Sequence, residues 1–301
     1  MKIVKLLLCL ITVFLFYSCG EKKVNDANVT GFSVKDDLNN QLYFNTVPSR
    51  VISLAPNLTE MVFSLGIEDK LVGNTLYCLY PEAAKKKEKV GDLLTIDFEK
   101  VLSLKPDLIL ITVEGNTKDS YEKLKNLGLK IFVSNPRDFK GIKNTYSDLG
   151  KIFKVENKAE KTINDWNTSF DSIVKRKEQY PREKAMFLVS LNPLMLAGKS
   201  TFINELMTSA GLYNIASTSP MNYPVFNREE ILKYNPDYIV LENRFLNDIK
   251  NLEKAYPEWK SINAVKNGRI IFFESDLYLA PGPRFITALE DLFSKLHPQG
   301  R

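Results

Sequence analysis

One stretch of the chain occurs twice. Residues 97–111 read DFEKVLSLKPDLILI, and residues 227–241 read NREEILKYNPDYIVL. Each copy begins with a polar residue suited to capping a helix, carries a glutamate in the first turn (Glu99 or Glu229), and continues as a short amphipathic helix. A proline ends that helix, and the apolar run that follows is typical of a buried β-strand. The duplication predicts two halves of the chain with the same fold.

Strand and helix patterns alternate around the two copies. We expect a hairpin over 32–44 and a helix after Asn57-Leu58-Thr59-Glu60, which reads as a capping box. Further helices are expected before Gly128, over 201–210 and over 285–296, and strands over 51–54, 70–75, 130–134, 185–190 and 269–273. This alternation predicts an α/β fold with mostly parallel sheets and crossover helices.

A longer helical pattern separates the two copies. In residues 156–178, an apolar stripe runs over about six turns without glycine or proline; its members are Ile163, Trp166, Phe170, Ile173 and Val174. Such a helix is about 35 Å long. We expect it to join two αβ lobes, with an ordinary surface helix of a single domain as the alternative. The predicted organisation is a signal peptide (1–18), a flexible tether (19–30), an N-terminal lobe (31–152), the connecting helix (153–181) and a C-terminal lobe (182–301).

The first residues are typical of an export signal. Two lysines precede an apolar run from Leu6 to Tyr17, which is shorter than the ~20 residues that span a bilayer. The following Ser18-Cys19 resembles a bacterial lipobox, so we expect lipidation of Cys19 and anchoring to a membrane on its periplasmic or outer side. Of the three cysteines, only Cys78 then remains free, and no disulfide framework is possible within one mature chain.

Composition and motifs argue against several kinds of chemistry. The formal net charge of +5 falls to +3 without Lys2 and Lys5, and it is spread along the chain, unlike a nucleic-acid-binding surface. Residues 197–201 resemble the end of a phosphate-binding loop, but Pro193 stands where its first glycine is needed, so Ser200 or Thr201 reads as a helix cap. The only histidine, His297, leaves no basis for a histidine-rich metal site or a hydrolase triad, and we expect no metal, no cofactor and no catalytic residue.

Taken together, these features resemble the periplasmic-binding-protein family for vitamin B12 and iron-siderophores, the receptors of ABC importers. The resemblance extends over about 47–298. It rests on residues 50–60 (RVISLAPNLTE), the two glutamate-containing copies, Gly198-Lys199 and residues 280–284 (APGPR). The resemblance implies two lobes joined by a rigid helix, with the ligand in the cleft between them.

The resemblance also implies which residues act. By position, Glu99 and Glu229 would dock on arginines of a symmetric ABC permease dimer, although a glutamate in a first helical turn is also favoured by the helix dipole. The expected ligand contacts are Tyr77, Tyr80, Leu93, Met195, Tyr223, Tyr278 and Arg284. Aromatic faces suit a corrin or a catecholate, and Arg284 suits an anionic chelate, unless these side chains pack within their own lobes.

The sequence therefore predicts a monomeric, lipid-anchored substrate-binding protein of an ABC importer that binds a metal chelate, either a corrinoid or a ferric siderophore. A haem receptor of the same type is the first alternative. An exported α/β enzyme acting on the cell envelope is the second, and a scaffold lipoprotein without a small ligand is the third.

Overall fold

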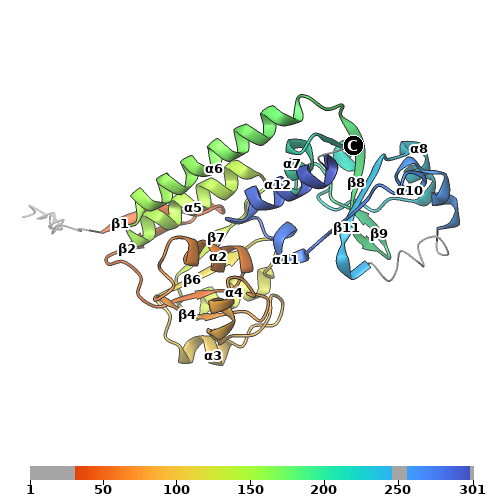
Figure 1. The fold of residues 1–301 in the computed structure, drawn as a ribbon. Coiled ribbons are helices and arrows are strands. Elements are labelled where there is room, and N and C mark those ends of the chain that lie inside the picture. The colour runs from red at the N-terminus through yellow and green to blue at the C-terminus, as the bar shows by residue number, and fades with distance from the viewer. Residues whose placement is uncertain (1–30, 246–255, 299–301) are drawn as a thin grey trace, which may run out of the picture. The chain divides into compact units, whose positions relative to one another are not determined.

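A computed structural model of the chain describes residues 31–245 and 256–298 (Figure 1). The predicted signal peptide, the tether and the lipidation site at Cys19 lie outside the described residues. From Phe32 onward, the described residues form one compact unit. It opens with the predicted hairpin, in which β1 (Phe32–Lys35) pairs antiparallel with β2 (Gln41–Phe44).

The first lobe is built on a parallel sheet of five strands in the order β5-β4-β3-β6-β7. Its strands are β3 (Val51–Ser53), β4 (Leu71–Asn74), β5 (Glu88–Lys89), β6 (Leu108–Thr112) and β7 (Ile131–Ser134). Its helices are α2 (Pro56–Ser64), the 3-10 helix η1 (Glu82–Lys86), α3 (Phe98–Ser103), α4 (Lys118–Asn126) and α5 (Phe139–Phe153).

The second lobe repeats this plan in the order β10-β8-β11-β12, all parallel, with β9 added antiparallel to β8. Its strands are β8 (Glu183–Leu191), β9 (Leu194–Leu196), β10 (Leu212–Asn214), β11 (Tyr238–Glu242) and β12 (Ile270–Phe273). Its helices are α7 (Phe202–Ser209), α8 (Arg228–Tyr234), α10 (Asn263–Lys266), α11 (Ser275–Tyr278) and α12 (Phe285–Leu296), with 3-10 helices η2 (Ile215–Thr218), η3 (Asn243–Phe245) and η4 (Pro257–Ser261).

The two sequence copies occupy equivalent places in the two sheets. Asp97 caps α3 and Asn227 caps α8, each accepting a hydrogen bond from a backbone N–H three residues on. After the proline, Asp107 accepts a hydrogen bond from the backbone N–H of Arg50, and Asp237 accepts one from that of Lys184. Each aspartate thus ties the start of its own strand, β6 or β11, to the start of the neighbouring strand, β3 or β8.

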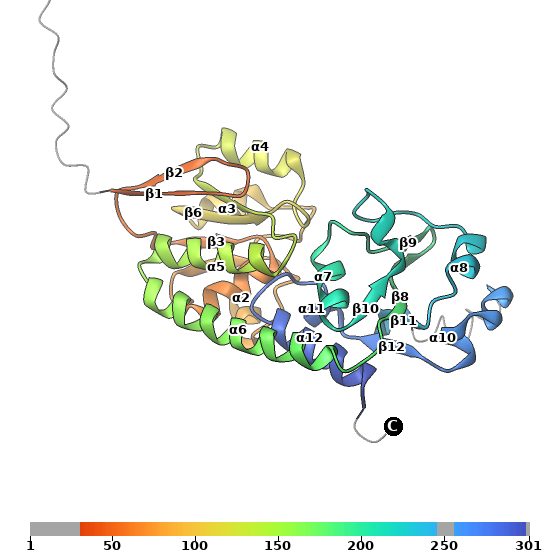
Figure 2. The same cartoon turned by 90° about the horizontal axis from the view of Figure 1, so that it is seen from above.

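A long helix connects the lobes, as predicted. This helix, α6 (Glu156–Lys177), packs against α5, α7 and α12 (Figures 1 and 2). The rings of Tyr146 and Trp166 lie 4.7 Å apart, and Phe139 stacks between Phe170 of α6 and Phe285 of α12. The aromatic side chains of α5 therefore join α6 and the last helix in one apolar core.

The predicted α/β fold with two lobes and a connecting helix is confirmed, whereas the residue numbers at which we divided the lobes stay a prediction. One local prediction was wrong. Asn57 to Glu60 do not form a capping box, because α2 begins earlier, with Ala55 as N-cap and Pro56 in the first turn, and has no side-chain cap. Asn57 and Glu60 lie inside the helix and bond instead to residues after β12. Thr201 does cap α7, as expected.

Candidate ligand-binding cavity

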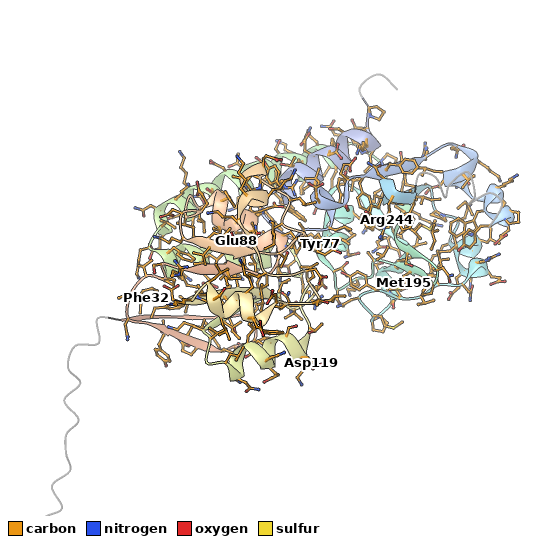
Figure 3. The ribbon with its side chains drawn as sticks, turned by 90° about the horizontal axis from the view of Figure 1, so that it is seen from below. Phe32, Tyr77, Glu88, Asp119, Met195 and Arg244 are labelled. Atoms are coloured by element: carbon orange, nitrogen blue, oxygen red, sulfur yellow. The ribbon has the colours of Figure 1, made fainter. Side chains whose placement is uncertain are left out.

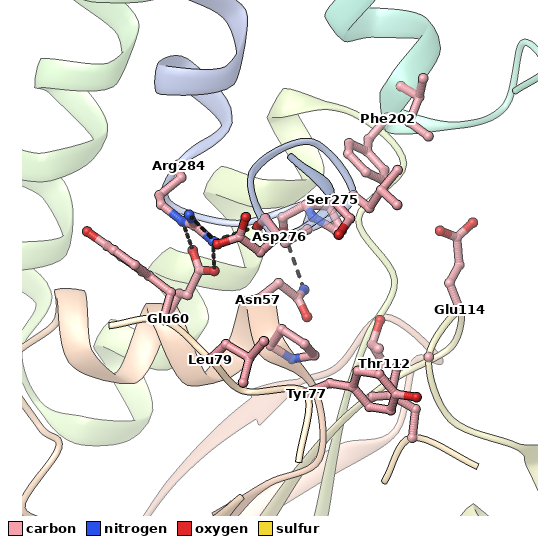
Figure 4. A pocket seen from close by; sticks show the side chains of 18 of the residues that line it. Asn57, Glu60, Tyr77, Leu79, Thr112, Glu114, Phe202, Ser275, Asp276 and Arg284 are labelled. Atoms are coloured by element: carbon pink, nitrogen blue, oxygen red, sulfur yellow. Dashed lines mark hydrogen bonds and ion pairs between the residues drawn. The ribbon is translucent and has the colours of Figure 1, made fainter. Parts of the chain in front are cut away.

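A cavity of about 470 Å³ opens where strands of both sheets end (Figure 4). In the first lobe it is lined after β3 by Asn57 and Glu60, after β4 by Tyr77, Leu79 and Tyr80, and after β6 by Glu114 and Gly115. In the second lobe it is lined by Val189 of β8, by Glu242 at the end of β11 and, beyond β11 and β12, by Arg244, Ser275 and Asp276. Ligands of open α/β sheets bind at the carboxyl ends of the strands, and the volume lies within the range of small-molecule sites.

Large apolar side chains are exposed on the cavity wall. Tyr77 is 57% exposed and Tyr80 is 47% exposed, and Leu79 and Leu279 are also open to solvent. Figure 3 labels Tyr77 in the first lobe and Arg244 in the second. Exposed apolar groups gathered in a concave site mark a place where a ligand with apolar faces can bind.

An ion pair between the lobes forms one end of the cavity. Arg284 donates from Nε and Nη2 to the two carboxylate oxygens of Glu60, at 3.0 and 2.6 Å, in a bidentate fork (Figure 4). The same guanidinium also donates to the carboxylate and the backbone carbonyl of Asp276 and lies 4.1 Å above the ring of Tyr80. Arg284 therefore lines the cavity with its charge already paired.

Burial and the contact with Arg284 act in opposite directions on the pKa of the Glu60 carboxyl. The Glu60 side chain is only 3% exposed, and its desolvation raises the pKa of the carboxyl, while the hydrogen bonds from Arg284 oppose that rise. Burial thus favours the protonated form of Glu60, and Arg284 favours the ionised form.

A second polar bridge joins the lobes across the cavity. The Tyr223 hydroxyl donates to Glu114 at 3.2 Å, and Glu114 also pairs with Arg137. Burial, followed by the neighbouring Glu114 carboxylate, raises the pKa of Tyr223 well above its usual value. The phenol is therefore neutral at physiological pH and acts as a hydrogen-bond donor.

The cavity contains most of the residues that we expected around a ligand. Tyr77, Tyr80, Leu93, Tyr223 and Arg284 line it. Their contact with a ligand stays a prediction.

Two expected residues lie elsewhere. Tyr278 is 1% exposed, stacks on Phe273 and donates its hydroxyl to Asp291, so the expectation that it faces the cleft was wrong. Met195 lies on β9 beside β8 and Val225 and does not line the cavity.

Several lining residues were not predicted from the sequence. Asn57 and Glu60 were assigned to helix capping, and Glu114, Glu242 and Arg244 were not singled out at all. For Glu114 and Arg244 the signal was their position two residues after the end of β6 or β11, and Glu242 is the last residue of β11.

Glu99 and Glu229 occupy the same position in the two copies, as the second residue of α3 and of α8. Both side chains are exposed, and neither carboxylate has a hydrogen bond or ion pair with another described residue. The caps are supplied by Asp97 in one copy and by Asn227 with Glu230 in the other. Helix capping therefore leaves both carboxylates free to contact another molecule.

Cys78 and His297 both pack against other side chains of the protein. Cys78 is fully buried, with the hydroxyls of Thr59 and Thr75 around its sulfur. His297 stacks on Tyr180, and burial lowers the pKa of its imidazole. Across residues 31–245 and 256–298, no cluster of three or more His, Cys, Asp or Glu side chains is placed to hold a metal, and no helix is long and apolar enough to cross a membrane.

Comparison with known proteins agrees with this geometry. Residues 51–277 match the model of the periplasmic binding protein family. The chain is 32% identical over 271 residues to an uncharacterized ABC transporter substrate-binding lipoprotein, YvrC of Bacillus subtilis, covering 87% of this chain and 85% of that one. It is 29% identical to a vitamin B12-binding protein of Photorhabdus laumondii, covering 84% and 90%. The chain therefore belongs to the periplasmic binding protein family.

Solved structures share the fold. The periplasmic vitamin B12-binding protein BtuF of Vibrio cholerae superimposes with a TM-score of 0.73 at 27% identity, covering 83% of this chain and 97% of that one. A periplasmic haem-binding protein of Pseudomonas aeruginosa gives a TM-score of 0.75 at 24% identity, covering 84% and 94%. Proteins named for different ligands share this architecture, so the fold alone does not identify the ligand of this chain.

Proposed function

We propose that this protein is the substrate-binding lipoprotein of an ABC importer, and that it captures a metal chelate, either a corrinoid such as cobalamin or a ferric siderophore. The family match and the likeness to an ABC transporter lipoprotein support the transport role. The likeness to two vitamin B12-binding proteins supports a corrinoid.

The observation that carries the proposal is the cavity itself. Loops after parallel strands of both lobes place Tyr77, Leu79, Tyr80 and Leu279 around one concave space, with their apolar surface open to solvent. A chelate with a broad apolar face would cover these side chains, and removing such surface from water favours binding by about 25 cal/mol per Å². The polar groups among them would orient the ligand.

Thermal unfolding of the full-length protein in detergent with a panel of chelates tests this proposal. A ligand at one hundred times its Kd stabilises the folded state by about 2.7 kcal/mol, which raises Tm by roughly 5 °C or more. We expect that rise with cyanocobalamin or with a ferric siderophore. A rise with haem alone would assign the protein to the haem alternative, and no rise with any chelate would contradict the proposal.

For delivery, we propose that Glu99 and Glu229 dock on the permease. They are equivalent by the internal repeat, exposed, and not engaged by another described residue. A receptor with two similar halves can present two such carboxylates to arginines of a twofold-symmetric permease, and paired charges of this kind fix orientation.

Reversing both charges separates docking from ligand binding. The double variant Glu99→Lys, Glu229→Lys should lose chelate uptake in cells while the purified protein keeps its affinity for the chelate. The matched control is Glu122→Lys, Glu160→Lys, which reverses two exposed glutamates on α4 and α6 and should leave uptake intact. Normal uptake by the first variant would refute the docking role.

We also propose that Cys19 carries the lipid anchor. Replacing it with alanine should release the protein from the membrane fraction, whereas the same change at Cys78, which is buried in the first lobe, should not. Equal membrane retention of the Cys19→Ala variant and the parent chain would contradict an anchor at this residue.

A further inference from the structure

The charges around the cavity distinguish between classes of chelate. Four carboxylates line it, those of Glu60, Glu114, Glu242 and Asp276, against the guanidinium groups of Arg244 and Arg284. No lysine among the described residues lines the cavity. The lining therefore carries an excess of negative charge.

Neither lining arginine is available as an unpaired cation. Arg284 is held between the carboxylates of Glu60 and Asp276, and its Nε, Nη1 and Nη2 all donate within the protein. Arg244 donates from Nε to Glu242 at 2.6 Å. Glu114 is paired with Arg137, which is not itself among the lining residues.

An anionic ligand would therefore meet unfavourable conditions on entry. To bind Arg284 it would have to displace Glu60, which is nearly fully buried and would be left as an uncompensated carboxylate. Elsewhere it would approach carboxylates whose repulsion is strengthened where the bound ligand itself displaces water from the cavity. A ligand with amide N–H donors or a positive charge would instead find carboxylate oxygens as acceptors.

From this arrangement we infer that the cavity selects an uncharged or cationic chelate, such as an amide-bearing corrinoid or a cationic hydroxamate siderophore, and discriminates against anionic catecholate chelates and haem. The inference rests on the proposed function and narrows its substrate class. It also reverses the expectation, drawn from the sequence, that Arg284 would favour an anionic chelate.

Calorimetric titration of the full-length protein in detergent tests the inference with four probes. Cyanocobalamin is uncharged, ferrioxamine B is cationic, and ferric enterobactin and haem are anionic. We expect cyanocobalamin or ferrioxamine B to bind at least about tenfold more tightly than either anion, a difference typical of modest charge complementarity. Tighter or equal binding of an anion would overturn the charge inference. The proposed receptor function stands if cyanocobalamin or a ferric siderophore binds, and it gives way to the haem alternative if haem alone binds.

A variant pair shows whether the carboxylates cause the selection. In the Glu242→Gln, Asp276→Asn variant, the disadvantage of the anionic probes should shrink by about tenfold. The control variant neutralises one aspartate and one glutamate on α4, Asp119→Asn and Glu122→Gln. These exposed charges lie outside the cavity, so the disadvantage of the anionic probes should stay unchanged. An unaltered preference in the cavity variant would overturn the inference. If none of the four probes binds the parent protein, the proposed function fails and the inference fails with it.

Discussion

Replacing Arg284 with methionine should destabilise the folded protein far more than the loss of a surface charge. Arg284 is 16% exposed and Glu60 is 3% exposed, so the substitution leaves a buried carboxylate without its partner. Breaking a buried pair in this way costs about 3–5 kcal/mol. The comparable pair of Arg244 with Glu242 has an arginine that is 61% exposed, and breaking it should cost only about 0–1 kcal/mol.

The pH dependence of this loss follows from Glu60. Its pKa is raised in the folded protein, so its contribution to stability is fully present below the unfolded value near 4.5 and is lost as pH rises through the folded value. Removing Arg284 takes away the interaction that opposes the rise, so the pKa of Glu60 should climb further. The penalty of Arg284→Met should therefore be largest near neutral pH and smaller at about pH 5.

Urea unfolding followed by circular dichroism, at both pH values, measures these differences in the free energy of unfolding. Arg244→Met is the matched control. The double variant Glu60→Leu, Arg284→Met should recover much of the loss, because no buried charge then remains unpaired. A loss below about 1 kcal/mol for Arg284→Met at neutral pH, or a double variant less stable than the single one, would refute the reasoning.

Three further predictions concern the frame around the cavity. Thr201→Ala should lower the free energy of unfolding by about 1 kcal/mol, because the hydroxyl caps α7, and Thr201→Ser should restore most of it; equal losses in the two variants would contradict a capping role. Gly198→Ala should cost about 1–3 kcal/mol in urea unfolding, because a Cβ there would lie 2.2 Å from the carbonyl oxygen of Met221, and an unchanged midpoint would count against that close packing. Asp107→Ala and Asp237→Ala should each cost about 1–3 kcal/mol, since each frees a backbone N–H of the adjoining strand, and a loss in only one of them would argue against equivalent roles.

The regular part of the fold could be predicted because its signals are local. The repeated stretch contains its own cap, helix, proline and strand, and the structure reproduces these elements in both lobes. The stripe of α6 was equally clear, since its apolar positions recur at the helical period.

The helix α5 was not predicted, and its glycines explain why. Gly141 and Gly150 weaken the helical pattern over 139–153. In the structure, Gly150 has a packing role, because a Cβ there would lie 2.7 Å from that of Ala159 on α6. A glycine that reads as a helix breaker in sequence is what allows the two helices to approach.

The site was harder to predict because its partners lie far apart in the chain. Glu60 and Arg284 are separated by 224 positions, and so are Asn57 and Pro281, so local pattern reading assigned Asn57 and Glu60 to a capping box. Tyr278 was misplaced for a similar reason, since only the fold shows its ring stacked on Phe273. Tyr77 and Tyr80 do line the cavity, because parallel sheets gather the loops after their strands at one edge, and their contact with a ligand stays a prediction.

The central claim, that a chelate binds in this cavity, is tested most directly by titrating cyanocobalamin and a ferric siderophore into the parent protein and two tyrosine variants. Tyr77 is 57% exposed on the cavity wall, and Tyr43 is 69% exposed on β2, outside the cavity. Tyr77→Ala should weaken binding of the cognate chelate by about tenfold or more, as expected for the loss of an aromatic contact, and Tyr43→Ala should leave the Kd unchanged. Equal affinities of the two variants and the parent would contradict the account.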